Sequence, residues 1–163
     1  PGKTVFFPQD HQPGRLAASD FTNCNELGVT INRIKFDHML FHCVLTYSNM
    51  ESVSLCFSES FEALSQGIQE AFWEFGGVPE RHRTDSLSAA VLNHSNRKLH
   101  TERYLALMEH YRSTPERTNA RCANENGDVE SSNRHLKDRI DQALLLRGSR
   151  EFASREEYVR FVK

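Results

Sequence analysis

The chain has 163 residues, of which 38% are hydrophobic and 26% charged, and its net charge is −2. A chain of this length suits one domain with a single core, built from a sheet with helices on it. No apolar run approaches the roughly 18 residues of a membrane span, and the first residues lack the charged-then-apolar order of a secretory signal, so we expect a soluble, cytoplasmic protein.

Three strands are predicted in the first third of the chain. Residues 15–23, "RLAASDFTN", alternate between two faces of mostly small side chains. Residues 35–48 form a β-branched and aromatic run, and a short turn leads from it into residues 52–58. Short turns between successive strands predict an antiparallel meander.

A helix and a fourth strand follow. Between residues 58 and 77 the hydrophobic period becomes that of a helix, with Ser58 or Ser60 available as N-cap and a glycine pair at its end. Residues 80–85 then form a short strand, as expected after a crossover helix, with Asp85 at the C-terminal end. The residues expected on the apolar face of the helix are Phe61, Leu64, Ile68, Ala71, Phe72 and Phe75.

The second half of the chain is predicted to be mainly helical. Residues 98–113 have the period of a helix that Pro115 closes, and residues 117–122, "RTNARC", are predicted as a short fifth strand. A third, long helix is predicted over residues 128–148. A capping box at residues 154–157 opens one more helix, and we expect the natural protein to continue beyond it. The inward-facing residues expected on the third helix are Val129, Leu136, Ile140, Ala143 and Leu144.

The predicted order is three strands, a helix, a strand, a helix, a short strand and a helix. It indicates an α/β fold with a mixed sheet flanked by helices, in which three antiparallel strands precede strands that alternate with helices. This order resembles the ribonuclease H-like arrangement. We expect residues 1–14 to be a lead-in segment, residues 15–148 to be the core and residues 149–163 to begin a C-terminal helical extension.

Three carboxylates lie at element boundaries of this predicted fold. Asp20 lies on the first strand, Asp85 at the tip of the fourth, and Glu130 in the first turn of the third helix. If the two strands are neighbours and the helix crosses their ends, the three acids converge. Each acid also fits a structural role: Asp20 could cap a turn with Asn23, and Asp85 could cap a helix that starts at Ser86. Glu130 could stabilise its own helix start, and spacing alone leaves both interpretations open.

Converging carboxylates repel one another unless a hard divalent cation lies between them. Mg²⁺ takes oxygen ligands at about 2.0–2.1 Å and keeps waters that a substrate phosphate can replace. Two ions about 3.5–4 Å apart can activate an attacking oxygen and stabilise a leaving oxygen in phosphodiester chemistry. The converging interpretation therefore predicts Mg²⁺ or Mn²⁺, as two ions, on Asp20, Asp85 and Glu130.

Four stretches of the chain carry a family resemblance. They are "QDHQPGRLAASDF", "LTYSNMESVSL", "FEALSQGIQEAFWEFGGVPERHRTDSLSAAV" and "NGDVESSNRHLKDRI". Together they resemble the integrase-type catalytic core of the IstA-type insertion-sequence transposases, in the retroviral-integrase and ribonuclease H-like superfamily. The resemblance covers most of residues 9–140, and "AFWEFGGVPERHRTDSLSAAV" is its most specific part.

The resemblance implies a ribonuclease H-like fold with an Asp-Asp-Glu triad, carried here onto Asp20, Asp85 and Glu130. It also implies cleavage of DNA donor ends, transfer of the cut strand and a helper ATPase of the IstB type as partner. Because transposition acts on paired ends, we expect a homo-oligomer on DNA.

Two positions depart from the family pattern. Ser86 follows the second aspartate where the family usually has asparagine, and Asn126-Gly127-Asp128 replaces the usual lysine-glycine before the glutamate. Neither departure removes a metal ligand, but both bear on whether this copy is fully active. Glu125 is a rival third ligand, and the "GDVE" context favours Glu130.

Positive charge lies in the second half of the chain. Residues 1–96 carry 6 basic and 11 acidic side chains, and residues 97–163 carry 14 basic and 11 acidic. On the third helix, Arg134 and Lys137 share a face with Glu130 and could bind the phosphates of a DNA end. The alternative is charge pairing on a solvated helix face.

The segment after Asp85 has no strong periodicity and is predicted to be an active-site loop. His94, Arg97 and Lys98 in this segment are further candidate DNA contacts. They complete the predicted DNA-binding set with the two cations of the third helix.

The four cysteines and eight histidines predict neither a disulfide framework nor a zinc site. No CxxC pair is present, so reduced thiols are expected, and Cys43 and Cys56 lie in apolar runs typical of buried cysteines. His38 and His42 are four residues apart, a spacing that suits zinc on a helix, whereas their segment is predicted to be a strand.

The sequence therefore favours the catalytic core of a DNA transposase, a divalent-metal-dependent polynucleotidyl transferase. No Ser/His/Asp or Cys/His constellation for nucleophilic catalysis stands out. Two alternatives remain open: a ribonuclease H-like nuclease that only hydrolyses, and a catalytically dead core that serves as a DNA-binding or assembly module.

Overall fold

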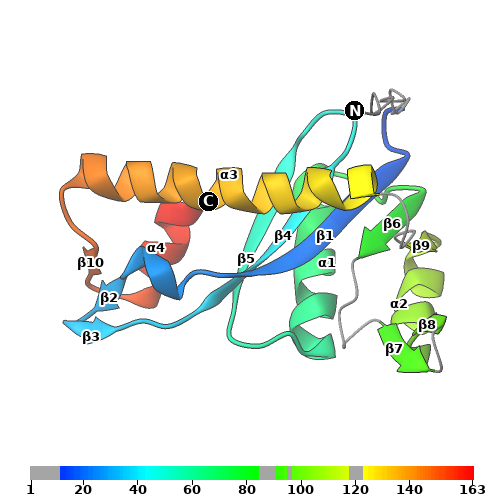
Figure 1. The fold of residues 1–163 in the computed structure, drawn as a ribbon, viewed down its shortest axis with the longest axis horizontal. Helices are drawn as coiled ribbons and strands as arrows, with labels where there is room; N and C mark the ends of the chain where they lie inside the picture. The colour runs from blue at the N-terminus through cyan, green and yellow to red at the C-terminus, as the bar shows by residue number, and fades with distance from the viewer. Residues whose placement is uncertain (1–11, 85–90, 95–96, 118–122) are drawn as a thin grey trace, which may run out of the picture.

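The computed structural model describes residues 12–84, 91–94, 97–117 and 123–163, and within these ranges the side chains of 91–94, 97–100, 117 and 123–130 are not described. Strands, helices and one short 3₁₀ helix, η1, alternate along the chain (Figure 1). Their bounds are β1 Leu16–Asn23, η1 Asn25–Leu27, β2 Thr30–Ile31, β3 Ile34–Lys35, β4 Met39–Leu45, β5 Glu51–Cys56, α1 Phe61–Phe75, β6 Arg81–Thr84, β7 Val91–His94, β8 Arg97–His100, α2 Glu102–Tyr111, β9 Thr114–Arg117, α3 Ala123–Arg147, β10 Glu151–Phe152 and α4 Arg155–Val162.

The main sheet has β1 at its centre. Its strand order is β5-β4-β1-β6-β9. β1 pairs antiparallel with β4 and parallel with β6, and β6 pairs parallel with β9. Three antiparallel strands are thus followed by two strands reached through helices, which confirms the predicted α/β fold with a mixed sheet flanked by helices.

Helices cover both faces of this sheet, and each face has its own hydrophobic core. Ala17 and Phe21 of β1 belong to the core that contains α1 and α2, together with the buried thiols of Cys43 and Cys56. Leu40 of β4 belongs to the core that contains α3 and α4. Figure 1 shows α3 crossing one side of the strands with α1 on the other. Because side chains of a strand alternate between faces, β1 contributes to both layers.

The helices α1 and α4 form where the sequence predicts them. α3 begins at Ala123, five residues before its predicted start, so Glu130 is the eighth residue of the helix rather than part of its first turn, and it does not stabilise the helix start. In α1, the Ser60 hydroxyl accepts a hydrogen bond from the Ala63 N–H at 3.2 Å, and Gly76 takes a left-handed conformation at the C-terminus. In α4, the Ser154 hydroxyl accepts from the Glu157 N–H at 3.2 Å, as the capping box predicts. No helix in the described part of the chain is long and apolar enough to cross a membrane.

The segment after β6 differs from its prediction. β7 and β8 pair antiparallel where the sequence predicts a loop, and residues 85–90 and 95–96 lie outside the described residues. α2 begins at Glu102 rather than at Lys98. Thr101 caps α2, because its hydroxyl accepts from the Tyr104 N–H at 3.3 Å. Two four-residue strands without clear alternation give a weak sequence signal, and this explains the difference.

The fifth strand lies earlier than predicted. β9 spans Thr114–Arg117, and the remainder of the predicted strand, residues 118–122, lies outside the described residues. Pro115 lies inside β9 and does not close α2, which ends at Tyr111 with Arg112 in a left-handed conformation. β9 is an edge strand, where proline is tolerated because one side of the strand has no ladder to join.

The segment 149–163 packs against the second core. β10 pairs parallel with β2, and β2 pairs with β3 in a small sheet that the sequence does not predict. Phe152 and Tyr158 are buried with residues of α3. The division of the chain into lead-in, core and extension stays a prediction.

A buried histidine ties α4 to the sheet. His38 Nδ1–H donates to the Phe36 carbonyl oxygen at 2.9 Å, so Nε2 accepts from the Tyr158 hydroxyl at 2.7 Å. His38 is 2% exposed, and burial lowers the pKa of its imidazole below the ordinary 6.5. The neutral form is therefore the one that fits the folded protein.

We predict that Gly67→Ala destabilises the fold although alanine is the better helix former. A Cβ at Gly67 would lie 2.2 Å from Cδ1 of the buried Phe41 ring. Overpacking typically costs about 1–3 kcal/mol, which outweighs the propensity gain of about 1 kcal/mol. Urea unfolding measures the change. Gly77→Ala is the control, because nothing lies within 4 Å of its added Cβ; equal stabilities of the two variants would contradict the packing.

We predict that the free energy of unfolding falls as the pH drops from 7.5 to 5. His38 has a lowered pKa when folded, so the unfolded chain takes up more protons below about pH 6.5, at a cost of up to about 1.4 kcal/mol per pH unit. The stability that neutral His38 contributes is complete above the pKa of the unfolded chain, and it is lost as the pH falls through the pKa of the folded protein. Urea titrations at several pH values should give a shallower fall for His38→Gln, and an unchanged profile would refute the assignment.

Candidate active site

Asp20 lies near the middle of the sheet. It is a half-buried residue of β1, and its cross-strand partner on β4 is His42. On the other side, Thr84, the last residue of β6, pairs with Ser19, the residue before Asp20. β6 therefore ends beside the part of β1 that carries the carboxylate.

The Asp20 carboxylate is held through both of its oxygens. Oδ1 accepts from the Phe21 N–H at 2.8 Å, and Oδ2 accepts from the Asn133 side-chain Nδ2–H at 2.9 Å. Asn133 comes from α3, so this contact joins the helix to β1. Each carboxylate oxygen has a second lone pair, so the group can bind a cation while it keeps these hydrogen bonds.

Asn133 also contacts His42, through the oxygen of its side-chain amide. Its Nδ1 lies 2.8 Å from Asn133 Oδ1, and its Nε2 lies 3.6 Å from Glu51 Oε2, which is too far for a hydrogen bond. His42 is 1% exposed and Asn133 7%. Burial lowers the pKa of the His42 imidazole, against the opposing effects of Asn133 and Glu51. The ring is therefore neutral at neutral pH.

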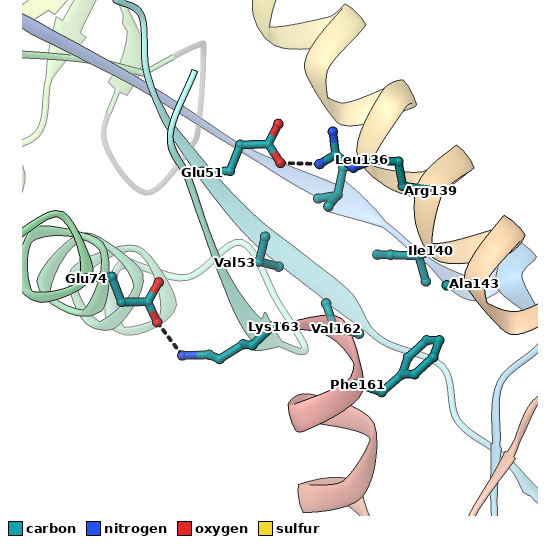
Figure 2. A pocket seen from close by; sticks show the side chains of 10 residues that line it. All are labelled: Glu51, Val53, Glu74, Leu136, Arg139, Ile140, Ala143, Phe161, Val162 and Lys163. Carbon is teal, nitrogen blue, oxygen red and sulfur yellow. Dashed lines mark hydrogen bonds and ion pairs between the residues drawn. The ribbon is translucent and has the colours of Figure 1, made fainter. Parts of the chain in front are cut away.

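Glu51 of β5 lies beyond His42, on the side of the ring away from Asn133. Its carboxylate accepts from the Arg139 guanidinium of α3, as Figure 2 shows. The pair borders a cavity of about 440 Å³ between β5, α3 and α4, which has Val53, Leu136 and Ile140 among its walls. Asp20 does not line this cavity. The other ionic groups that line the cavity also pair, as Lys163 does with Glu74. The cavity is thus separate from the carboxylate site.

The other two acids of the predicted triad are less fully described. Asp85 lies outside the described residues. Glu130 belongs to α3, three residues before Asn133, and its side chain is not described. Among the described side chains no three acidic, histidine or cysteine groups gather into a metal site. The structure therefore gives the contacts of Asp20 with Phe21 and Asn133, and the convergence of the three acids stays a prediction.

The predicted DNA-binding residues lie in two places. Arg134 is exposed on α3 and has no ion pair among the described residues, whereas Lys137 Nζ pairs with Glu26 Oε1 at 2.5 Å. Lys137 therefore pairs with an acid outside its own helix, and its role in DNA binding stays a prediction. Arg97 and Lys98 belong to β8, and their side chains are not described.

Two residues of this site were missed by sequence reasoning. Asn133 falls on the same stripe of α3 as the buried Leu136, Ile140 and Leu144, so a polar residue at an apolar position was the available signal. His42 was considered only as a zinc ligand, although a histidine within an apolar strand also indicates a buried hydrogen-bonding group.

The surroundings of Asp20 suit a hard divalent cation. The oxygens of a half-buried carboxylate are the ligands that Mg²⁺ and Mn²⁺ prefer. Two described hydrogen bonds of the carboxylate come from neutral donors, a backbone N–H and a side-chain amide. The donor chemistry therefore fits the predicted metal.

Comparison with curated proteins gives two relatives. The chain is 47% identical over 161 residues to the uncharacterized protein y4jA/y4nE/y4sE of Sinorhizobium fredii (strain NBRC 101917 / NGR234), covering 97% of this chain and 32% of the relative. It is 26% identical over 145 residues to a protein of Aminobacter aminovorans named Transposase, covering 88% of this chain and 28% of the relative. The chain thus spans about a third of the length of these relatives, and no family model matches it.

Solved structures identify the fold. A chain of the simian T-cell lymphotropic virus intasome, in complex with PP2A regulatory subunit B56 gamma, matches 96% of this chain and 50% of its own length with a TM-score of 0.69 at 13% identity. The HTLV-2 integrase catalytic core domain in complex with magnesium, in its dimeric form, matches 82% of this chain and 74% of its own with a TM-score of 0.60 at 20% identity. The chain has the ribonuclease H-like fold of retroviral integrase catalytic cores.

Proposed function

We propose that this chain is the catalytic core of an IstA-type DNA transposase, which cleaves transposon ends and transfers the cut strands to target DNA. The observation that carries the proposal is the position of Asp20 on the central strand of an integrase-type sheet, bonded to the helix that carries Glu130. The relative named Transposase supports DNA as the substrate.

The described backbone supports the convergence of all three acids. β6 ends at Thr84, beside Ser19 of β1, and Asp85 is the next residue in the sequence. Glu130 precedes Asn133 by three positions on α3, and residues three apart share a helix face. Because the Asn133 amide reaches Asp20, we infer that the Glu130 carboxylate lies on the same side of the sheet.

The three acids would hold Mg²⁺ or Mn²⁺, as two ions. When bound, such ions activate an attacking oxygen and stabilise the leaving oxygen of a phosphodiester. The chain itself contributes placement: Asp20 is half-buried, and Phe21 and Asn133 fix the direction of its carboxylate. The HTLV-2 integrase catalytic core, which shares this fold, was solved in complex with magnesium, and this supports the choice of metal.

DNA phosphates would be bound mainly by exposed cations near this site. Arg134 is one position past Asn133 on α3, so an exposed guanidinium stands next to the helix stripe that meets Asp20. Lys137 has to leave its ion pair with Glu26 before it can bind DNA. We also assign Arg97 and Lys98 of β8 to DNA binding.

The proposal extends to assembly and partners. A transposase that joins two ends has to act as a homo-oligomer on DNA, inside the cell that holds the DNA. The resemblance of the sequence to the IstA type implies an ATPase of the IstB type as helper. The chain spans about a third of its relatives' length, so end recognition and helper contacts are assigned to the whole protein.

We predict that the 163-residue chain binds Mn²⁺ and that Asp20→Asn, Asp85→Asn and Glu130→Gln each weaken binding at least tenfold. Each substitution removes one carboxylate charge from a shared site. Isothermal titration calorimetry with wild type and the variants measures the affinities. Asp141→Asn is the control, because Asp141 lies on α3 and pairs with Arg150.

The outcomes separate three functions. For the transposase, we expect all three variants to lose Mn²⁺ affinity. We also expect the full-length protein to give joined products on transposon-end DNA. Metal binding with cleavage but no joining would support a hydrolytic nuclease instead. Absence of Mn²⁺ binding in wild type, with DNA present, would support a binding or assembly module and contradict the proposal.

We predict that Arg134→Gln weakens DNA binding several-fold. It should also reduce the steepness of the fall in log affinity with log salt by about one. Each phosphate contact contributes about 0.9 to that slope on duplex DNA. Fluorescence anisotropy at several salt concentrations measures both quantities. Arg160→Gln removes an equal charge from an exposed site on α4 and should leave the slope unchanged. Equal effects of the two variants would contradict a specific role for Arg134.

A further inference from the structure

We propose that His42 is a positioning residue, which holds the Asn133 amide so that it donates to the Asp20 carboxylate. The inference rests on the proposed function, because it takes Asp20 to be a metal ligand. It assigns to a residue of β4 a part in the site that Asp20 and α3 form. The relevant contacts run from Asp20 through Asn133 to His42, at 2.9 Å and 2.8 Å.

The chemistry of the three groups fixes the direction of each hydrogen bond. An ionised carboxylate only accepts, so Asn133 has to turn its NH₂ group toward Asp20. Its carbonyl oxygen Oδ1 then faces His42, and a carbonyl only accepts, so His42 Nδ1 has to carry the hydrogen. A flipped amide would place its oxygen against the carboxylate and its NH₂ against Nδ1–H. The neutral Nδ1–H form of His42 therefore selects the amide orientation that Asp20 needs.

Burial makes this selection strict. His42 is 1% exposed and Asn133 7%, so solvent has little access to either group to replace a lost partner. Both strands lie inside the sheet, and Asp20 and His42 are directly opposite each other in the β1–β4 ladder. The Asn133 amide is thus held between two fixed points on neighbouring strands.

The surroundings of Nε2 agree with a hydrogen on Nδ1. If Nε2 carried it, it could donate to Glu51, but the bare Nδ1 would then face the Asn133 oxygen. Glu51 instead accepts from Arg139, as Figure 2 shows, and stays 3.6 Å from Nε2. Nε2 has no hydrogen-bond partner among the described residues, as expected for the side of the ring that carries no hydrogen.

Three substitutions test the role of His42. His42→Asn keeps a side-chain N–H close to the position of Nδ1, whereas His42→Leu removes it. Asn133→Leu removes the group that His42 positions. His38→Leu is the matched control, because it also replaces a buried histidine by leucine, and the hydrogen bonds of His38 go to Phe36 and Tyr158.

We expect Mn²⁺ calorimetry to give near wild-type affinity for His42→Asn and His38→Leu, and affinity about tenfold weaker for His42→Leu and Asn133→Leu. The double variant His42→Leu/Asn133→Leu should bind no more weakly than Asn133→Leu alone, because both changes break one pathway. Thermal unfolding of every variant identifies any loss that comes from unfolding alone.

A measurement on the wild type needs no substitution. Nitrogen-15 NMR of the histidine side chains at pH 8 should find the hydrogen of His42 on Nδ1. A hydrogen on Nε2 would overturn the inference, as would wild-type Mn²⁺ affinity in a folded His42→Leu variant or additive losses in the double variant. If the wild type itself binds no Mn²⁺, the proposed metal site fails, which is distinct from a failure of positioning alone.

Discussion

The alternation of side chains along β1 is the constraint on which the site depends. Ala17 and Phe21 enter the core beneath α1 and α2, and Asp20, between them, faces α3. A one-residue slip against β4 would turn Phe21 toward α3 and bury the carboxylate among the aromatic rings. Because both faces of the sheet are covered, such a slip would disrupt two cores, and the register is strongly specified. The position of the carboxylate is therefore a consequence of how the sheet is packed.

The polar contact between α3 and β1 lies on an otherwise apolar stripe. Leu136, Ile140 and Leu144 pack into the second core, and Asn133 occupies the next position of the same stripe. Burying an amide and an imidazole is unfavourable unless each finds a partner, and removing one partner typically costs about 1–3 kcal/mol. Apolar side chains at both positions would pack without this requirement. The contact of Asn133 with the Asp20 carboxylate offers a reason for the buried amide and imidazole. The candidate site thus determines which residues occupy these two buried positions.

Much of the fold was predictable because β1, β4, β5 and the α-helices are six or more residues long, whereas the four-residue β6 is predictable from its place after a crossover helix. The two-residue strands of the small sheet and the paired strands β7 and β8 have no clear periodic pattern. The sequence predicts that Pro115 ends a helix, whereas it lies in an edge strand, where proline is tolerated. In the candidate site, the position of Asp20 on the first strand could be predicted from the pattern of residues 15–23. The roles of Asn133 and His42 could not be predicted, because they depend on contacts over long sequence separations. Asp20 and Asn133 are 113 positions apart, and His42 and Asn133 are 91 positions apart. Such contacts follow from packing rather than from local sequence.

The function proposed for this chain depends on Asp20 as a ligand of a divalent cation in a site for phosphodiester chemistry. The most direct test is anomalous diffraction from crystals of the chain grown with Mn²⁺. We expect an anomalous peak within about 2.0–2.2 Å of an Asp20 carboxylate oxygen, with the Asn133 amide still bonded to the carboxylate. A Mn²⁺ peak bound elsewhere, or an Asp20 carboxylate without a metal at saturating Mn²⁺, would contradict this role of Asp20.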